Sequence, residues 1–366
     1  MIRCRFCGSE QGSVVLDAGR QPASDLFPAA SEPGPDELYP LRMWMCASCH
    51  LAQLVEDPTV PEEPRGQEPE ALLRQAADAV GSLAAAGFLQ PGSRVVEYTS
   101  PHGGDWLPLL TARGLVAAAP DEQADLVVDN ISLMHERDQA AALRERVERL
   151  TPDGVIAFQY HSLATILSRA QWNALRHGHY AYYSTPALIG MLQAMGLAAV
   201  TAAGFPLYGG TVLLVARRGG RPDDRLRQIL AEEIEAGVLD AVTAEALQRD
   251  CAATSEALAS FVRAERAAGR RVVGYSAASR AVALLCRAGI GPELLEVIGD
   301  ASPAKRGRRM PGSAIPIVDP AALVGTRPDT VVLFVPDLLD EVRRAMPEIE
   351  ANGGTWVVAE DLVPAR

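Results

Sequence analysis

Two closely spaced pairs of cysteines near the N-terminus constrain the fold of this chain more than any other feature of its sequence. The pairs are Cys4 and Cys7, in CRFCG, and Cys46 and Cys49, in CASCH. Pairs of this spacing can supply four thiolates in a tetrahedral array to Zn²⁺, and a four-thiolate site is closed to a catalytic water. The segment between the pairs is therefore predicted to loop back around a structural zinc ion.

The composition is that of an ordinary soluble globular protein, and it excludes several classes of partner. Of the 366 residues, 48% are hydrophobic and 22% are charged, with a net charge of −12. This acidic balance argues against a nucleic-acid or anionic-membrane partner. No apolar run reaches the roughly 18–20 residues that span a bilayer, and the N-terminus lacks an apolar signal-peptide core. We therefore expect a cytoplasmic protein with reduced thiols.

Beyond a segment rich in Pro and Glu, short apolar strands alternate with helical patterns. This alternation predicts parallel βα units, hence an α/β chain with two Rossmann-like domains behind the zinc module. The run GLAAVTAAGFPLYGGTVLLVARR predicts an antiparallel pair of strands that closes the first sheet. The predicted division is a zinc-binding module (1–55), a linker (56–70), a first α/β domain (71–220), a helical connector (221–270) and a second Rossmann-like domain (271–366).

Several motifs occur together and in a definite order. After the cysteine pairs come a strand that ends in Glu97, then RHGHYAYYS (176–184), GGTVLLVARR, and GYSAASR (274–280), followed by Asp300 and the only lysine, Lys305. The assembly resembles the zinc-containing, S-adenosylmethionine-dependent C-methyltransferases that act on nucleotide-linked keto-deoxysugars in antibiotic biosynthesis. The resemblance covers nearly the whole chain and implies that the first α/β domain is a truncated class I methyltransferase domain.

The resemblance implies a catalytic cluster in RHGHYAYYS, which matches a family stretch similar to YHEHFSYFS. Arg176 and Gly178 replace a tyrosine and a glutamate of the family. In the family this cluster is thought to remove a proton beside a ketone, and a histidine of near-neutral pKa suits that step. In an extended segment, His177 and His179 would face the same side and line one cleft. The candidate catalytic residues are His177, His179, Tyr180, Tyr182 and His161.

The resemblance also implies a methyl-donor loop at VVEYTSPHGG (95–104). Its candidate donor-binding residues are Glu97, Ser100, His102, Gly103 and Gly104. Thr99, however, stands where the family has glycine, and a β-branched residue disfavours the positive φ that glycine permits. Ala119 stands where an acidic residue should receive the ribose hydroxyls, and only PDEQ separates two strands that normally flank a further helix and strand. We therefore predict a degenerate donor site and leave S-adenosylmethionine binding open.

A second ligand site is predicted at the start of the C-terminal domain. The segment GYSAASR opens a helix, whose first N–H groups can receive an anion. A phosphate or carboxylate group of the substrate is expected there, and a solvated loop is the alternative. The substrate is then a small molecule, either a nucleotide-linked sugar or another phosphate-bearing intermediate. The residues assigned to this site are Ser276, Ser279, Arg280 and Lys305.

Three functions remain open at this point. The first is a C-methyltransferase with an unusual donor loop. The second is an acid–base enzyme that acts beside a carbonyl without a methyl donor, such as an isomerase, cyclase or eliminase. The third is a non-catalytic relative that binds a partner or a carrier-bound intermediate. The resemblance favours proton abstraction next to a carbonyl, and the donor loop makes the methyl transfer itself the weakest part of the hypothesis.

Overall fold

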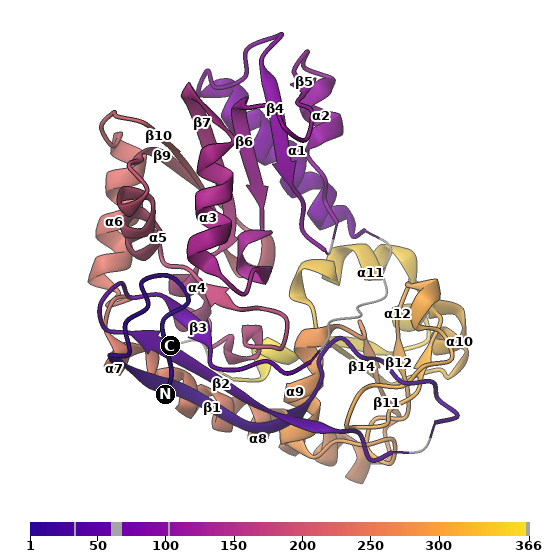
Figure 1. The fold of residues 1–366 in the computed structure, drawn as a ribbon. Coiled ribbons are helices and arrows are strands. Elements are labelled where there is room, and N and C mark those ends of the chain that lie inside the picture. The colour runs from indigo at the N-terminus through magenta and orange to yellow at the C-terminus, as the bar shows by residue number, and fades with distance from the viewer. Residues whose placement is uncertain (33, 60–67, 102, 364–366) are drawn as a thin grey trace.

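The computed structural model describes residues 1–32, 34–59, 68–101 and 103–363. Its strands form three sheets, of four, six and five strands. In Figure 1 the six-stranded sheet lies at the top, the N-terminal strands run along the bottom, and the five-stranded sheet lies at the lower right. None of the helices in these ranges is long and apolar enough to cross a membrane.

The four-stranded sheet belongs mainly to the cysteine-bearing module, and all its pairs are antiparallel. Its order is β1-β2-β3-β8, and the register places Gly12 opposite Cys46. Strand β8 comes from much later in the chain and completes this sheet. The strands are β1 (Gly12–Pro22), β2 (Leu38–Cys46), β3 (Ala52–Leu54) and β8 (Ala181–Tyr182).

The six-stranded sheet has the order β5-β4-β6-β7-β10-β9. Strands β5, β4, β6 and β7 are parallel, and β10 runs antiparallel to both β7 and β9, which confirms the predicted closing pair. Residues 118–123 join β5 to β6 without a helix, which confirms the missing helix and strand. The strands are β4 (Arg94–Tyr98), β5 (Val116–Ala117), β6 (Ala124–Asn130), β7 (Leu150–His161), β9 (Ala198–Phe205) and β10 (Thr211–Arg217).

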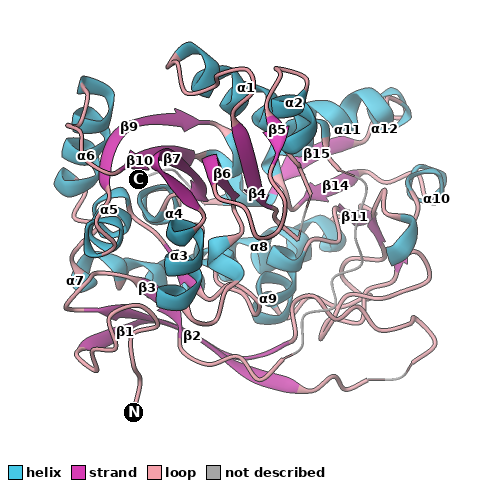
Figure 2. Cartoon of the chain, turned by 45° about the horizontal axis from the view of Figure 1, so that its top comes forward, coloured by secondary structure: helices cyan, strands magenta, loops and turns pink. Residues whose placement is uncertain are grey.

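Helices flank this sheet, as Figure 2 shows, and side-chain caps fix where several of them begin. Asp138 accepts a hydrogen bond from the Ala141 N–H at the start of α3, and Ser184 accepts one from the Ala187 N–H at the start of α5. The helices are α1 (Glu70–Ala85), α2 (Leu107–Thr111), α3 (Gln139–Glu148), α4 (Leu163–Ser168) and α5 (Thr185–Ala194), with 3₁₀ turns η1 (Leu133–His135), η2 (Trp172–Ala174) and η3 (Leu207–Gly209).

A helical segment follows, as the sequence predicts. Its longest helix, α8, packs against β1 of the N-terminal module and against α9 of the last domain, and thereby joins the two. Apolar side chains on one face of α8, Leu258 and Val262 among them, are buried in this contact. The helices are α6 (Asp224–Glu235), α7 (Ala241–Ala244) and α8 (Ala246–Ala267).

The five-stranded sheet is wholly parallel, in the order β13-β12-β11-β14-β15, and together with the six-stranded sheet it confirms the predicted α/β class. The strands are β11 (Val272–Tyr275), β12 (Ile298–Gly299), β13 (Ile317–Val318), β14 (Thr330–Leu333) and β15 (Thr355–Val358). The helices are α9 (Ser279–Ala288), α10 (Pro320–Gly325), α11 (Leu339–Ala345) and α12 (Glu348–Ala351), with 3₁₀ turns η4 (Pro303–Lys305), η5 (Pro336–Leu338) and η6 (Ala359–Leu362).

Candidate functional site

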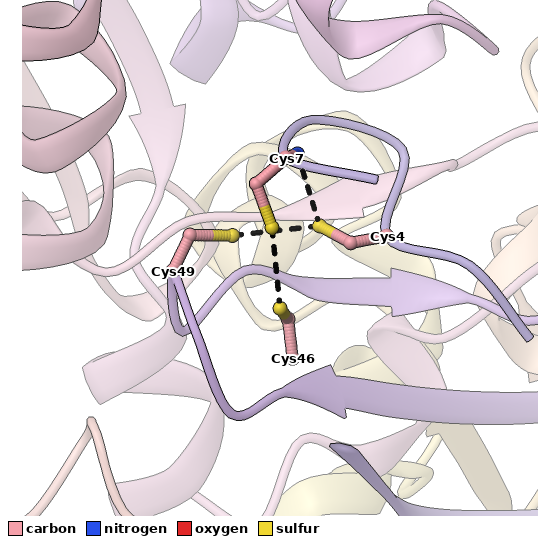
Figure 3. Close-up of side chains that lie close together, drawn as sticks. All are labelled: Cys4, Cys7, Cys46 and Cys49. Atoms are coloured by element: carbon pink, nitrogen blue, oxygen red, sulfur yellow. Dashed lines mark hydrogen bonds between the residues drawn. The ribbon is translucent and has the colours of Figure 1, made fainter. Parts of the chain in front are cut away.

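The four N-terminal cysteines converge, as the sequence predicts. Their sulfur atoms all lie within 4.8 Å of one another, with Cys4 Sγ 3.4 Å from Cys49 Sγ and Cys7 Sγ 3.6 Å from Cys46 Sγ (Figure 3). Tetrahedral zinc with Zn–S bonds of about 2.3 Å needs sulfur separations of about 3.8 Å, so the cluster fits a zinc ion. The hydrogen bond from Cys49 lowers the pKa of the Cys4 thiol to about 5, which favours the thiolate form that binds metal. A zinc ion held there would have no open coordination position.

A cavity of about 410 Å³ lies between the two α/β domains. Ligands of open α/β sheets bind outside the carboxyl ends of the strands, and here the carboxyl ends of both sheets contribute to one cavity. The residues that follow the strands of the first sheet are Ser100, Ile131 and His161, and those that follow the strands of the second are Ser276, Asp300 and Val335.

His179 lines this cavity and is held by its neighbours. Arg176 Nε donates to His179 Nε2 at 2.8 Å, and the ring of His135 meets that of His179 edge-on, with centroids 4.6 Å apart. A guanidinium can only donate, so His179 Nε2 carries a lone pair and the proton of the neutral imidazole lies on Nδ1. This is the protonation state that a general base requires.

Tyr182 also lines the cavity, where it positions the backbone of Arg176. Its hydroxyl accepts from the Arg176 N–H at 3.2 Å and donates to the Ala174 carbonyl at 3.2 Å. Burial raises the pKa of Tyr182, so the hydroxyl stays protonated.

The prediction that His177 and His179 lie on an extended segment and share one cleft is wrong. Residues 177–178 form a turn in which Gly178 has a φ of 84°, and the His179 N–H donates to the Arg176 carbonyl. His177 therefore points away from the cavity, with Nε2 3.2 Å from the Pro40 carbonyl and its ring against Tyr39.

Tyr180, another predicted catalytic residue, is likewise absent from the cavity lining. Its buried ring lies between the guanidinium groups of Arg5 and Arg137, whose Cζ atoms are 4.9 and 5.0 Å from the ring centroid. These contacts are with the cysteine-bearing module and with the segment between η1 and α3.

His161, at the end of β7, lines the cavity opposite His179. Its Nε2 lies 3.1 Å from Gln171 Oε1. Burial and, after it, the positive charge of Arg280 lower the pKa of His161 to about 3, so the imidazole is neutral at physiological pH. Such a group is a weak base and serves better as a neutral hydrogen-bonding partner.

All four residues predicted to bind an anion line the same cavity. Arg280, in the first turn of α9, is only 8% exposed. Its Nη2 lies 3.0 Å from Glu360 Oε1, but the angle is not that of a hydrogen bond, and among the described residues neither Nε nor Nη2 finds a hydrogen-bond partner. The Lys305 ammonium, in contrast, has protein partners: its Nζ donates to the Ala277 carbonyl and lies over the ring of Phe27.

Most of the described residues predicted to bind the methyl donor do not line the cavity. Glu97 accepts hydrogen bonds from the N–H groups of Trp106 and Leu107, at 2.8 and 2.6 Å, and so anchors the start of α2. Of the predicted donor set, Ser100 alone lines the cavity, and His102 lies outside the described residues.

Protein side chains lie against the glycines of the donor loop. A Cβ atom on Gly103 would come within 2.3 Å of Glu68 Oε1, and one on Gly104 within 2.7 Å of Leu72 Cγ. The Gly104 N–H donates to the Glu68 carboxylate at 3.1 Å. Glu68 and Leu72 thus occupy the space in which a ligand could approach the backbone of these glycines closely.

The turn after β5 is not part of the cavity either. The acidic side chains nearest to Ala119 in sequence, Asp121 and Glu122, are exposed and do not line it. Glu122 instead accepts a hydrogen bond from the Ala119 N–H at 3.1 Å, and Arg149 binds the Ala119 carbonyl at 2.9 Å. The turn is fixed by protein groups.

Sequence reasoning missed Arg176 and Glu68 as lining residues of the cavity. Arg176 could have been found, because it departs from the tyrosine that the resemblance implies. Glu68 gave no signal, since it lies in the Pro- and Glu-rich segment and is brought to the glycines only by the fold.

Three family models match consecutive parts of the chain. They are described as "Putative zinc binding domain" (residues 4–63), "Methyltransferase domain" (70–202) and "C-methyltransferase C-terminal domain" (206–360). The C-methyltransferase NovU of Streptomyces niveus is 24% identical over an alignment of 401 positions, which covers 97% of this chain and 94% of NovU. The chain therefore resembles a C-methyltransferase along almost its whole length.

Solved methyltransferase structures match part of the chain. An O-methyltransferase family protein from Burkholderia thailandensis is 15% identical with a TM-score of 0.32, covering 42% of this chain and 59% of that one. The 1,6-didemethyltoxoflavin-N1-methyltransferase of the same organism, solved with S-adenosylhomocysteine, is 18% identical with a TM-score of 0.28, covering 41% and 80%.

Proposed function

We propose that this relative of the C-methyltransferases is an acid–base enzyme that removes a proton next to a carbonyl group of a small anionic metabolite. The observation that carries the proposal is the cavity, where His179 and the under-bonded guanidinium of Arg280 face one space. In this proposal His179 is the base. Neutral His161 keeps its one proton on Nε2, where it is bonded to Gln171 Oε1, so its other ring nitrogen can only accept a hydrogen bond.

The anionic group of the substrate has a further role in this proposal. Arg176 Nε donates to the lone pair of His179 Nε2 in the structure. A substrate carboxylate or phosphate that pairs with Arg176 would draw the guanidinium off Nε2 and make that lone pair available for the proton. Arg280 would hold the same or a second anionic group. Nucleotide-linked sugars, which the resemblance implies, are among the substrates that fit this description.

The methyl-donor part of the resemblance is not included in the proposal. Glu97 is bonded to the start of α2, Glu68 and Leu72 lie against the glycine loop, and the turn after β5 is held by protein groups. Methyl transfer is the second candidate function, and the similarity to NovU over 97% of the chain favours it.

The experiment combines ligand binding with proton exchange. Calorimetric titration with S-adenosylmethionine and S-adenosylhomocysteine is expected to give no binding, and micromolar binding would reinstate methyl transfer. Nucleotide-linked keto-sugars and simple keto acids in deuterated water are then screened by mass spectrometry for deuterium beside the carbonyl. His179→Gln is expected to slow the exchange about 100- to 10,000-fold, whereas His50→Gln, bonded to Leu239 outside the cavity, is the matched control. Equal exchange in the two variants would remove His179 from its role.

A further inference from the structure

The cysteine-bearing module is bonded to the segment that carries His179. Strand β8 begins two residues after His179, yet it pairs with β3 of the N-terminal module, with Ala52 opposite Tyr182 and Gln53 opposite Ala181. The Leu54 N–H also donates to the Tyr180 carbonyl at 3.2 Å. The backbone next to His179 is thus part of the module's sheet.

Arg5 connects the first cysteine pair to this junction. It lies between Cys4 and Cys7, and its N–H donates to Gln53 Oε1 at 2.8 Å. Its Nε and Nη2 atoms both donate to the Leu54 carbonyl at 3.2 Å, and Nη1 donates to the Arg137 carbonyl at 3.1 Å. The same guanidinium lies against the ring of Tyr180. Its conformation depends on a loop that is closed by the four sulfur atoms.

Asp57 holds the turn itself. Its Oδ2 accepts a hydrogen bond of 2.6 Å from the N–H of Gly178, the residue between His177 and His179. Its Oδ1 accepts from the N–H and the hydroxyl of Thr59, at 2.9 and 2.6 Å, which fixes the carboxylate. Asp57 is only 6% exposed, so losing one of these bonds would leave a buried N–H without a partner.

We propose that Arg5 and Asp57 are positioning residues that link the four-cysteine site to the place of His179 in the cavity. A metal ion that closes the cysteine loops holds Arg5, and Arg5 holds β3 and Tyr180. Asp57, three residues after the end of β3, holds the turn before His179. The module then serves the reaction without touching the substrate. The catalytic importance of this link depends on the proposed role of His179, but the link itself does not.

The decisive comparison is Arg5→Met against Arg3→Met in the zinc-loaded protein. Methionine keeps the apolar stem of arginine and removes the guanidinium. The side chain of Arg3, directly before Cys4, is 72% exposed, and its ion pair among the described residues is with Glu10, so it is the matched control. Zinc content is measured by mass spectrometry, and the ring signals of His135 and His179 by NMR, assigned with single His→Gln variants. Arg5→Met is expected to retain zinc and shift both ring signals, whereas Arg3→Met overlays the wild type.

Asp57→Asn gives a second test far from the cysteines, and it stands even if Arg5→Met loses its metal. Asparagine has one acceptor oxygen where the turn and Thr59 require two, so the His179 signals are expected to shift with zinc still bound. Removing zinc with a chelator should shift them as well, and adding zinc should restore them. Unchanged His135 and His179 signals in both variants would overturn the proposal. Because these signals report position, they stay informative if His179 proves not to be the base.

Discussion

At the residue scale, Arg176 and His161 show how neighbouring groups set the protonation state of the cavity. Arg176 donates to His179 Nε2, and His161 is kept neutral by burial and by the charge of Arg280. Two imidazoles thus enter the cavity uncharged beside two guanidinium groups. The charged side chains among the described residues that line the cavity are of both signs: Arg176, Arg280 and Lys305 with Glu68, Asp300 and Glu341.

The depressed pKa of His161 predicts how stability depends on pH. The unfolded chain binds the proton with a pKa near 6.5 and the folded chain near 3, so stability is fully present above about pH 6.5 and falls as the pH drops towards 3. Between pH 7 and pH 5 the free energy of unfolding should fall by up to about 2 kcal/mol, less because the ring is partly exposed. Urea unfolding of the wild type and of His161→Gln at several pH values measures this loss. The same dependence of the free energy of unfolding on pH in both proteins would contradict the prediction.

At the scale of elements, Glu97 near the end of β4 binds the start of a helix. Both carboxylate oxygens of Glu97 are used by N–H groups at the start of α2. Negative charge near those N–H groups stabilises the helix start.

Glu97→Gln is therefore expected to destabilise the domain by about 1–3 kcal/mol, because one buried N–H loses its acceptor. Glu122→Gln, an exposed acid bonded to the Ala119 N–H, should cost less than about 0.5 kcal/mol. Urea unfolding gives both values. S-adenosylmethionine should raise the melting temperature of neither variant, and a clear rise in the wild type that is lost in Glu97→Gln would show instead that this residue binds the donor.

Elements with strong local signals could be predicted from the sequence, and sites set by distant contacts could not. The cysteine cluster and the alternating strands and helices follow from spacing and periodicity, the absent helix after β5 follows from the family resemblance, and the structure confirms all three. The sequence predicts an extended segment at Gly178, because no nearby residue indicates that Asp57 binds its N–H. The partners of Glu97 were missed for the same reason, since Trp106 and Leu107 carry no signal for that contact.

At the scale of the whole molecule, the cysteine-bearing module is also bonded to the last domain. Asp36 accepts hydrogen bonds from Arg309 Nη1 and Nη2, both at 2.7 Å, and from the Gly312 N–H at 2.6 Å. The two side chains are 16% and 6% exposed. Together with β8 and α8, this pair ties the module to both α/β domains that enclose the cavity.

Asp36→Asn should lower the free energy of unfolding by about 3 kcal/mol, because it leaves a largely buried guanidinium without its charge partner. Arg343→Met removes an exposed pair with Glu350 and should cost less than about 1 kcal/mol. Urea unfolding measures both, and hydrogen exchange should show the loss around residues 309–312 first. A loss of similar size in the two variants would mean that the Asp36 pair adds no special stability.

The place of β8 has a consequence for how the chain folds during synthesis. The cysteine-bearing module leaves the ribosome before the α/β domains, but its sheet is completed by Ala181 and Tyr182, which emerge only after most of the methyltransferase-like domain. Pairing between segments so distant in sequence carries a large loop-closure cost and forms slowly. Until then β3 has an unpaired edge that can associate with other chains. A nascent chain stalled before residue 181 is thus the form most exposed to aggregation, however well its metal is bound.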